Sequence, residues 1–347
     1  DAARRAGNVV QTVFFQRLGD TAAVRAQAAY REDSVAMRRL PAFGYDLPAL
    51  PGDAGYQTVV LPYPALLETS RALGSINFTP DAVDGTARRS PLLYRFRGRT
   101  YPAFGLAVAM VADSARFAGG PVQLSSTALR FSRLKLPLDD GTMLLNWRGP
   151  YRDPARKDHP ETYRVFPIAQ ILHSYQQVLA GGTPEVPLET FRGKVVFVGS
   201  TGAGLFDVRA NPFGPSDPGV LVHATLADNL LTGGFLTRAP SLVNVAALLG
   251  VALLAGLAVS FITAAWGSAV TGFALAAAYL GTAFWLFRGG LWLDTAAPTL
   301  AILLTFTGGM ALNYVTEGRK KRQIREMFGK YVAPEYLAQL AEDPSSL

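Results

Sequence analysis

Two stretches without a single Asp, Glu, Lys or Arg decide the fold: SLVNVAALLGVALLAGLAVSFITAAWGSAVTGFALAAAYLGTAFWLF at residues 241–287 and TAAPTLAILLTFTGGMALNYV at residues 295–315. A helix needs about 20 apolar residues to cross a hydrocarbon core about 30 Å thick. The first stretch is long enough for two crossings and the second for one. We therefore predict a bundle of three transmembrane helices within residues 240–315, at about 242–264, 268–287 and 295–315.

The composition narrows the classes of function. The chain has 347 residues, a formal net charge of +7 and no cysteine. Without cysteine there is no disulfide framework, no thiol catalysis and no Cys-ligated metal. The strongest basic cluster lies beside a predicted membrane helix, which membrane topology explains better than nucleic-acid binding does. We therefore expect the lipid bilayer, and no nucleic acid, among the partners.

A basic cluster follows the third predicted span. It consists of Arg319, Lys320, Lys321, Arg322 and Arg325. Positive residues next to a span stay in the cytoplasm, so the cluster predicts a cytoplasmic C-terminal segment. Three crossings then place residues 1–238 outside, in periplasm or extracellular space, for a multi-pass protein of the inner (plasma) membrane. The spans themselves contain no ionisable residue of the kind that marks a transport pathway, which argues against a transporter.

Residues 1–238 alternate apolar strands with helices, which predicts an α/β domain whose sheet is covered by helices. Residues 1–7 are expected to be the end of a helix that stops at Gly7. Further helices are expected around residues 22–39, at 64–73 with Gly74 as the stop, and at 102–113, 167–180 and 219–231. Expected strands cover residues 8–15, 75–78, 86–96, a hairpin of 129–136 with 142–147, and 194–199. The last of these, KVVFVG, is apolar throughout, as is typical of a strand inside a covered sheet.

The segment at residues 316–347 has the pattern of a coupling helix. Ile324, Met327, Phe328 and Tyr331 follow the i, i+3, i+4, i+7 spacing of one helical face, and Pro334 begins a further helix. Such an apolar face needs a partner, either another protomer or a following domain. An outer domain, a membrane bundle and a coupling helix together indicate the input half of a receptor.

Motifs for chemistry are weak. The glycine-rich loop at residues 199–204 follows an expected strand, but it lacks the Gly-Lys-Ser/Thr of a phosphate-binding loop and no helix follows at once. A turn that needs the backbone freedom of glycine explains it better. The three histidines, His159, His173 and His223, have no metal-ligand spacing, and His223 is better explained as a hydrogen-bonded core residue. We expect no catalytic residue and no metal site.

Five arginines gather near one expected strand: Arg88, Arg89, Arg95, Arg97 and Arg99. They would suit an anion, or they would form an ordinary solvated strand face. The solvated face is the more economical interpretation.

Several short motifs in a fixed order resemble the CHASE2 sensor domain. They are GNVV (7–10), LGSIN (73–77), DAVDGTARR (81–89), NWRGP (146–150), KVVFVGST (194–201), PGVLVHA (218–224) and NLL (229–231). The resemblance covers residues 1 to about 315, because CHASE2 domains of this kind are followed by three transmembrane helices. It implies an extracytoplasmic sensor for an unknown ligand or protein. It also implies a transmembrane helix and an opening part of the sensor before Asp1.

The tail MFGKYVAPE (327–335) is similar to the segment that leads into class III adenylate or guanylate cyclase domains. The resemblance therefore implies a receptor cyclase, a homodimer through its membrane and exit helices, with a catalytic domain after Leu347. Mg or Mn would bind only in that following domain, and no cofactor is expected in this chain. A kinase output and a non-enzymatic membrane subunit that binds a partner protein remain alternatives.

Candidate sensor positions are taken from the motif residues of this resemblance. They are Asp84, Gly85, Arg88, Arg89, Gly199, Thr201, Asp207, Gly219, His223 and Asn229. Phe328, Tyr331 and Pro334 are the candidate coupling residues.

Overall fold

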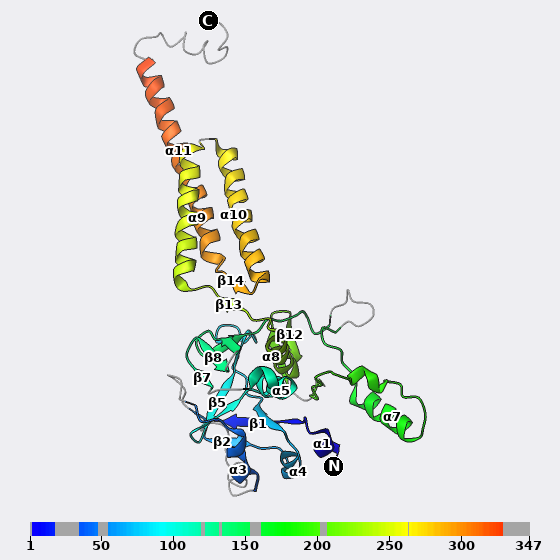
Figure 1. The fold of residues 1–347 in the computed structure, drawn as a ribbon. Helices are drawn as coiled ribbons and strands as arrows, with labels where there is room; N and C mark the ends of the chain where they lie inside the picture. The colour runs from blue at the N-terminus through cyan, green and yellow to red at the C-terminus, as the bar shows by residue number, and fades with distance from the viewer. Residues whose placement is uncertain are drawn as a thin grey trace. The chain divides into compact units, whose positions relative to one another are not determined.

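The computed structural model describes residues 2–17, 35–47, 55–118, 122–131, 134–152, 161–201, 207–262 and 264–328. The chain forms two compact units, Asp1–Thr237 and Arg238–Leu347 (Figure 1). The first unit mixes helices with small sheets, and the second consists mainly of three apolar helices. The predicted fold class, an α/β domain followed by an all-α bundle, is confirmed.

Strand β1 (Val10–Gln16) is the centre of a sheet ordered β2-β1-β3. It runs parallel to β3 (Ala72–Ser75), with Thr12 opposite Gly74, and antiparallel to β2 (Thr58–Val60), with Phe14 opposite Val60. Helix α1 (Ala2–Ala6) precedes it and ends at Gly7, whose φ of +64° suits glycine. Apolar and β-branched residues in β1 account for its strand conformation.

Helices cover one face of this sheet and aromatic rings cover the other. On the helical side, α5 (Phe104–Ala112) lies so close to β3 that a Cβ on Gly74 would overlap the backbone of Phe104. Helix α8 (Val220–Thr232) packs on α5 (Figure 1). On the other side, Phe15 is buried among aromatic rings, with centroids 5.2 Å from Tyr101 and 5.3 Å from Phe96.

Short ladders surround this core. The pairs are β4 (Arg89–Pro91) with β10 (Thr142–Leu144), β5 (Leu93–Phe96) with β6 (Arg99–Pro102), β7 (Gln123–Leu124) with β8 (Ala128–Phe131), β8 with β9 (Leu134–Pro137), and β11 (Val208–Asn211) with β12 (Gly214–Pro218). The remaining short helices are α3 (Val35–Arg39), η1 (Leu40–Phe43), α4 (Pro64–Glu68), α6 (Ser114–Phe117), α7 (Ile168–Leu179) and η2 (Leu188–Phe191).

The prediction of a helix over residues 64–73 was wrong in its second half. Helix α4 ends at Glu68, and the chain then enters β3. The hydroxyl groups of Thr69 and Ser70 donate to the carbonyl of Leu66, which closes the helix locally. Strand pairing then takes over, because Arg71 N–H donates to Val9 O at 2.7 Å. Gly74 is therefore a strand residue and no helix stop, and the strand expected at 75–78 lies earlier.

Two further strand predictions were wrong in their pairing. The strand expected at 86–96 is divided after Pro91, which has no N–H to continue a ladder, and its two parts pair with β10 and β6. The strand expected at 129–136 is itself the β8–β9 hairpin, so β10 pairs with β4 instead. The turn at Asp140 and Gly141 is confirmed, with φ of +51° and +74°.

The strand predicted at residues 194–199 was also wrong as a paired strand. The segment has no assigned secondary structure and belongs to no ladder among the described residues. Val196 is 56% exposed and Val198 is 81% exposed. The helices predicted at 102–113, 167–180 and 219–231 are confirmed as α5, α7 and α8. Of the helix expected around 22–39, only α3 lies within the described residues.

The second unit begins at Arg238, the last residue of β13 (Thr237–Arg238), and contains β14 (Leu291–Trp292). Its helices are α9 (Ser241–Phe261), α10 (Ala265–Arg288) and α11 (Ala296–Phe328). The segments Ser241–Phe261, Trp266–Arg288 and Ala296–Thr316 are long and apolar enough to cross a membrane. Helix α11 continues without a break to Phe328, so the basic cluster lies on the same helix as the third span.

Asp294 holds one end of this unit together. Its carboxylate pairs with Arg238 at 3.2 Å, and its carbonyl accepts from the Tyr279 hydroxyl at 2.6 Å. Its N–H donates to the Asn244 side chain at 3.2 Å. Residues near α9, α10 and α11 are therefore joined at one point. Tyr331 and Pro334 of the predicted coupling helix lie outside the described residues.

Candidate functional site

The first part of the candidate site is the turn at residues 81–89. Gly85 has a φ of +73°, and its N–H donates to Asp81 O at 2.8 Å. Asp84 accepts two bonds from the Arg88 guanidinium, at 2.6 and 2.8 Å, and one from Thr86 N–H at 3.0 Å. The Arg88 guanidinium, and then the Thr86 amide, hold the pKa of Asp84 well below its usual range. Three of the candidate residues thus lie in one turn that is stabilised by hydrogen bonds among its own residues. They are Asp84, Gly85 and Arg88.

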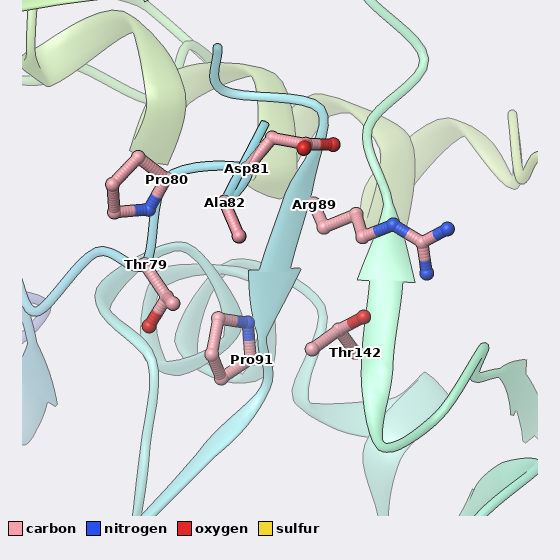
Figure 2. A pocket seen from close by; sticks show the side chains of 7 residues that line it. All are labelled: Thr79, Pro80, Asp81, Ala82, Arg89, Pro91 and Thr142. Carbon is pink, nitrogen blue, oxygen red and sulfur yellow. The ribbon is translucent and has the colours of Figure 1, made fainter. Parts of the chain in front are cut away.

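A small cavity lies beside this turn. It measures about 250 Å³ and is lined by Thr79, Pro80, Asp81, Ala82, Arg89, Pro91 and Thr142. Figure 2 shows the Arg89 guanidinium directed away from the two proline rings. That guanidinium pairs with Asp139 at 2.6 Å, across the β4–β10 ladder. The cavity is therefore mostly apolar, with polar groups at its rim, and its nearby charges are already paired.

The turn is connected to the hairpin formed by β11 and β12. Ala87 N–H donates to Ala210 O at 2.7 Å, and Ala87 O accepts from the Trp147 indole at 2.7 Å. Inside the hairpin, the Asn211 amide accepts from two backbone N–H groups and donates to Asp217 at 2.6 Å. The hairpin leads directly into α8, so hydrogen bonds and chain continuity connect the turn to the start of that helix.

The second part of the candidate site is the start of α8. Gly219 N–H donates to Asp207 O at 2.8 Å, and a Cβ on Gly219 would overlap the Asp207 carboxylate. Asp207 also pairs with Arg209 at 3.3 Å. A Cβ on Gly199 would lie only 2.7 Å from the Val220 side chain. Glycine at both positions therefore permits close approach of three chain segments.

His223 lies on the first turns of α8 and is 8% exposed. Its ring meets Phe104 edge-on at 5.7 Å, and its Nδ1 atom has no hydrogen-bond partner among the described residues. Burial, and then the charge of Arg209, lowers the pKa of His223 to about 4. The ring is therefore neutral at neutral pH. It is a core residue, as expected, but without the expected hydrogen bond at this nitrogen.

Asn229 is fully buried near the end of α8 and does not lie with the other candidates. Its Oδ1 accepts from Asn146 N–H at 2.8 Å, and its Nδ2 donates to Asn146 O at 3.0 Å. The Asn146 side chain in turn donates to Gly234 O at 3.1 Å. We call the two bonds between Asn229 and the Asn146 backbone the amide clamp. The amide clamp fastens α8 to the segment that follows β10.

The structure thus brings the candidates together in two groups. The turn holds Asp84, Gly85, Arg88 and Arg89, and the start of α8 holds Gly199, Asp207, Gly219 and His223. Thr201 is an exposed coil residue. The rest of the glycine-rich loop lies outside the described residues.

Sequence reasoning missed several members of the site. Asp139, Thr142 and Arg209 carried no local signal, because their partners are far away along the chain or on another element. The Asp140-Gly141 turn signal, directly after Asp139, was the nearest hint.

Within the described part of the chain, no three His, Asp or Glu side chains come close enough to hold a metal ion. The site geometry supports recognition through rearranged ion pairs, since each charged side chain of the turn already has a partner.

Comparison with known proteins supplies a family. The family model described as the CHASE2 domain matches residues 2–264, which include the first unit from Ala2 onward and α9. Among curated proteins and among solved structures, none matches the chain.

Proposed function

Because the chain belongs to the CHASE2 family, we propose that it is the sensor and membrane portion of a signalling receptor. The first unit is the sensor, and the three apolar helices of the second unit cross the membrane. Helix α8 carries this proposal. The candidate site meets its first turn, the amide clamp holds its end, and the chain continues from Thr232 to the first membrane helix at Ser241.

The proposed mechanism is a change of packing transmitted along α8. A ligand or protein that engages the cavity and turn would exchange contacts with Asp81, Arg88 or Arg89. The turn is bonded to the β11–β12 hairpin through Ala87 and Ala210, so its movement shifts the start of α8. A ligand can shift such an equilibrium only by its difference in affinity for the two states.

The proposed topology places the sensor outside the plasma membrane and the end of α11 in the cytoplasm. The basic cluster at residues 319–325 supports this orientation. The absence of cysteine gives a clean test, because one introduced cysteine reports alone. Val83→Cys, at a position 93% exposed on the sensor, should react with a membrane-impermeant maleimide in intact cells. Gln323→Cys on α11 should react only after the membrane is opened; the reverse pattern would invert the topology.

The proposed output is a class III adenylate or guanylate cyclase domain that uses Mg or Mn, working as a homodimer joined through the membrane and exit helices. The tail MFGKYVAPE supports this output. There are two alternatives: a receptor with a kinase domain as its output, or a non-enzymatic membrane subunit that binds a partner protein. Cyclic-nucleotide production by the full-length protein in membranes tests the proposal. We expect production that changes when the outer unit is removed, whereas no production would rule out the cyclase.

A further inference from the structure

The segment from Phe166 to Val198, which contains α7 and η2 and which we call the arm, presents apolar residues to solvent. The exposed face of α7 contains Ile168, Leu172, Tyr175 and Leu179, at 62%, 56%, 57% and 69% exposure. The residue that α7 buries is polar: Ser174 is 4% exposed and accepts from Val186 N–H at 2.9 Å. An amphipathic helix normally buries its apolar face. In α7 the apolar face is exposed instead, so this face needs a partner to cover it.

Among the described residues, the side-chain hydrogen bonds of α7 are made within the arm. Gln177 accepts from Glu185 N–H at 2.7 Å, Gln170 donates to Glu185 at 2.6 Å, and the rings of Phe166 and Phe191 lie 5.4 Å apart. Figure 1 shows α7 lying apart from the β2-β1-β3 sheet. Helix α7 is therefore held by bonds within the arm and leaves its apolar face exposed.

The sheet has a matching free edge at the beginning of β1. Val9 O accepts from Arg71 N–H and Val13 O accepts from Ile76 N–H, so these residues point their backbone groups at the β3 side. By the alternation of a strand, Val10 and Thr12 point theirs at the opposite edge. Strand β2 pairs with that edge only from Phe14 onward, and no other described strand pairs with Val10 or Thr12.

The sheet also has a face that is only partly covered. Thr12 lies opposite Gly74, whose missing Cβ would meet α5, so Val10, Thr12 and Phe14 share the face that α5 covers. The cover is incomplete there, because Phe14 is 39% exposed. An apolar helix placed beside α5 would bury it.

The end of the arm is already anchored at this place. The ring of Phe197 meets Phe104 of α5 edge-on at 5.5 Å, and both Val10 and Phe197 pack against the cluster of Phe104, Val108 and Ala227. Gly199 then contacts Val220 at the start of α8. The starts of α5 and α8 lie together near the end of β3, so a strand that ends at Gly199 runs parallel to β1.

We propose that the arm closes on its own sheet: residues 195–198 pair in parallel with the free edge of β1, and α7 lays its apolar face over Val10, Thr12 and Phe14. A run that is apolar on both sides, such as VVFV, suits a strand covered on both faces. A lipid surface fits less well, because residues 168–179 contain no Lys or Arg to meet anionic headgroups. The closed arm and the open arm are two states of the sensor, and Gly199 connects them to α8.

Disulfide trapping in the chain of residues 1–347, which contains no cysteine, tests this closure. Val10→Cys with Val195→Cys places both side chains on the α5 face of the closed sheet, because Val195 alternates with Phe197. Val10→Cys with Val196→Cys is the matched control, one residue along and on the opposite face. Mild oxidation should form an intramolecular disulfide about tenfold faster in the first pair, since only there can the Cβ atoms come within about 4.5 Å.

Equal rates in the two pairs, or no bond in either, would overturn the proposal. A bond between two chains, seen as a dimer on a non-reducing gel, would also overturn it, in favour of a second copy as the occupant. Hydrogen exchange of the unaltered protein gives an independent reading. Protection of alternate amides within residues 195–198 supports closure, and exchange of all four at the rate of an open chain contradicts it.

Discussion

Replacing Asn229 by alanine removes the amide clamp and nothing else from the core of α8. The Asn229 side chain is completely buried and makes two bonds, at 2.8 and 3.0 Å, to the backbone N–H and C=O of Asn146. Alanine offers neither a donor nor an acceptor. Both backbone groups of Asn146 then lose their partners in a partly buried position.

A buried polar group without a partner costs about 1–3 kcal/mol. Because Asn146 is only partly buried, its two groups should together lower the free energy of unfolding by about 2–4 kcal/mol, in the lower part of the range for two groups. Asn146→Ala is the matched control. It removes only the side-chain bond to Gly234 O at 3.1 Å and leaves the amide clamp intact, since the clamp uses the Asn146 backbone. The control should cost about 1 kcal/mol.

Urea unfolding of the full chain in detergent measures the difference. Trp147 is the tryptophan of the first unit, and its fluorescence can be isolated by Trp→Phe changes at Trp266, Trp285 and Trp292. With a slope of about 2 kcal/mol per molar urea, in the middle of the usual range, Asn229→Ala should lower the midpoint by about 1–2 M. If both variants lower the midpoint equally, the clamp does not hold α8 in the way its two bonds indicate.

Three more outcomes are expected from the same region. Gly105→Ala should lower the free energy of unfolding by about 1–3 kcal/mol, because its Cβ would lie 2.7 Å from His223 O; an unchanged urea midpoint would contradict this. The pKa of His223 is lowered to about 4, so the stability from keeping it neutral is present above about pH 6.5 and is lost as pH falls toward 4. His223→Leu should flatten that part of a stability–pH curve, and a curve of unchanged slope would show that another group is responsible. Asp84→Asn should leave the unfolding midpoint almost unchanged, because the Asp84–Arg88 pair is exposed, while altering the response of the full-length receptor; a large loss of stability would assign the turn a structural role.

Local signals in the sequence predicted the parts of the fold that depend on local physics. The three apolar helices follow from composition alone. Gly181 and Gly233, which follow α7 and α8, have φ of +72° and +74°, the left-handed conformation that glycine adopts at a helix end. The turns at Gly85 and Gly141 follow from the same property.

Pairing between distant segments could not be predicted in this way. Residues 64–73 carry a helical pattern, yet residues 72–75 form β3 because β1, far earlier in the chain, offers them a ladder. In the candidate site, Arg89 and Asp139 are 50 residues apart, and Asn146 and Asn229 are 83 apart. The motif resemblance selected both Asn229 and Arg89. Only the contacts in the structure show that Asn229 forms the amide clamp, whereas Arg89 lies at the rim of the cavity.

Helix α11 has a mechanical consequence that its composition hides. Its 33 residues form one continuous helix, which at 1.5 Å per residue is a rod of about 50 Å. In the proposed mechanism, a rotation imposed at Ala296, beside the Asp294 junction, would be carried along this continuous helix to Phe328. One inserted residue would turn the far end by about 100°. In the proposed receptor, the length of this rod is therefore as much a part of the signal as the identity of any side chain on it.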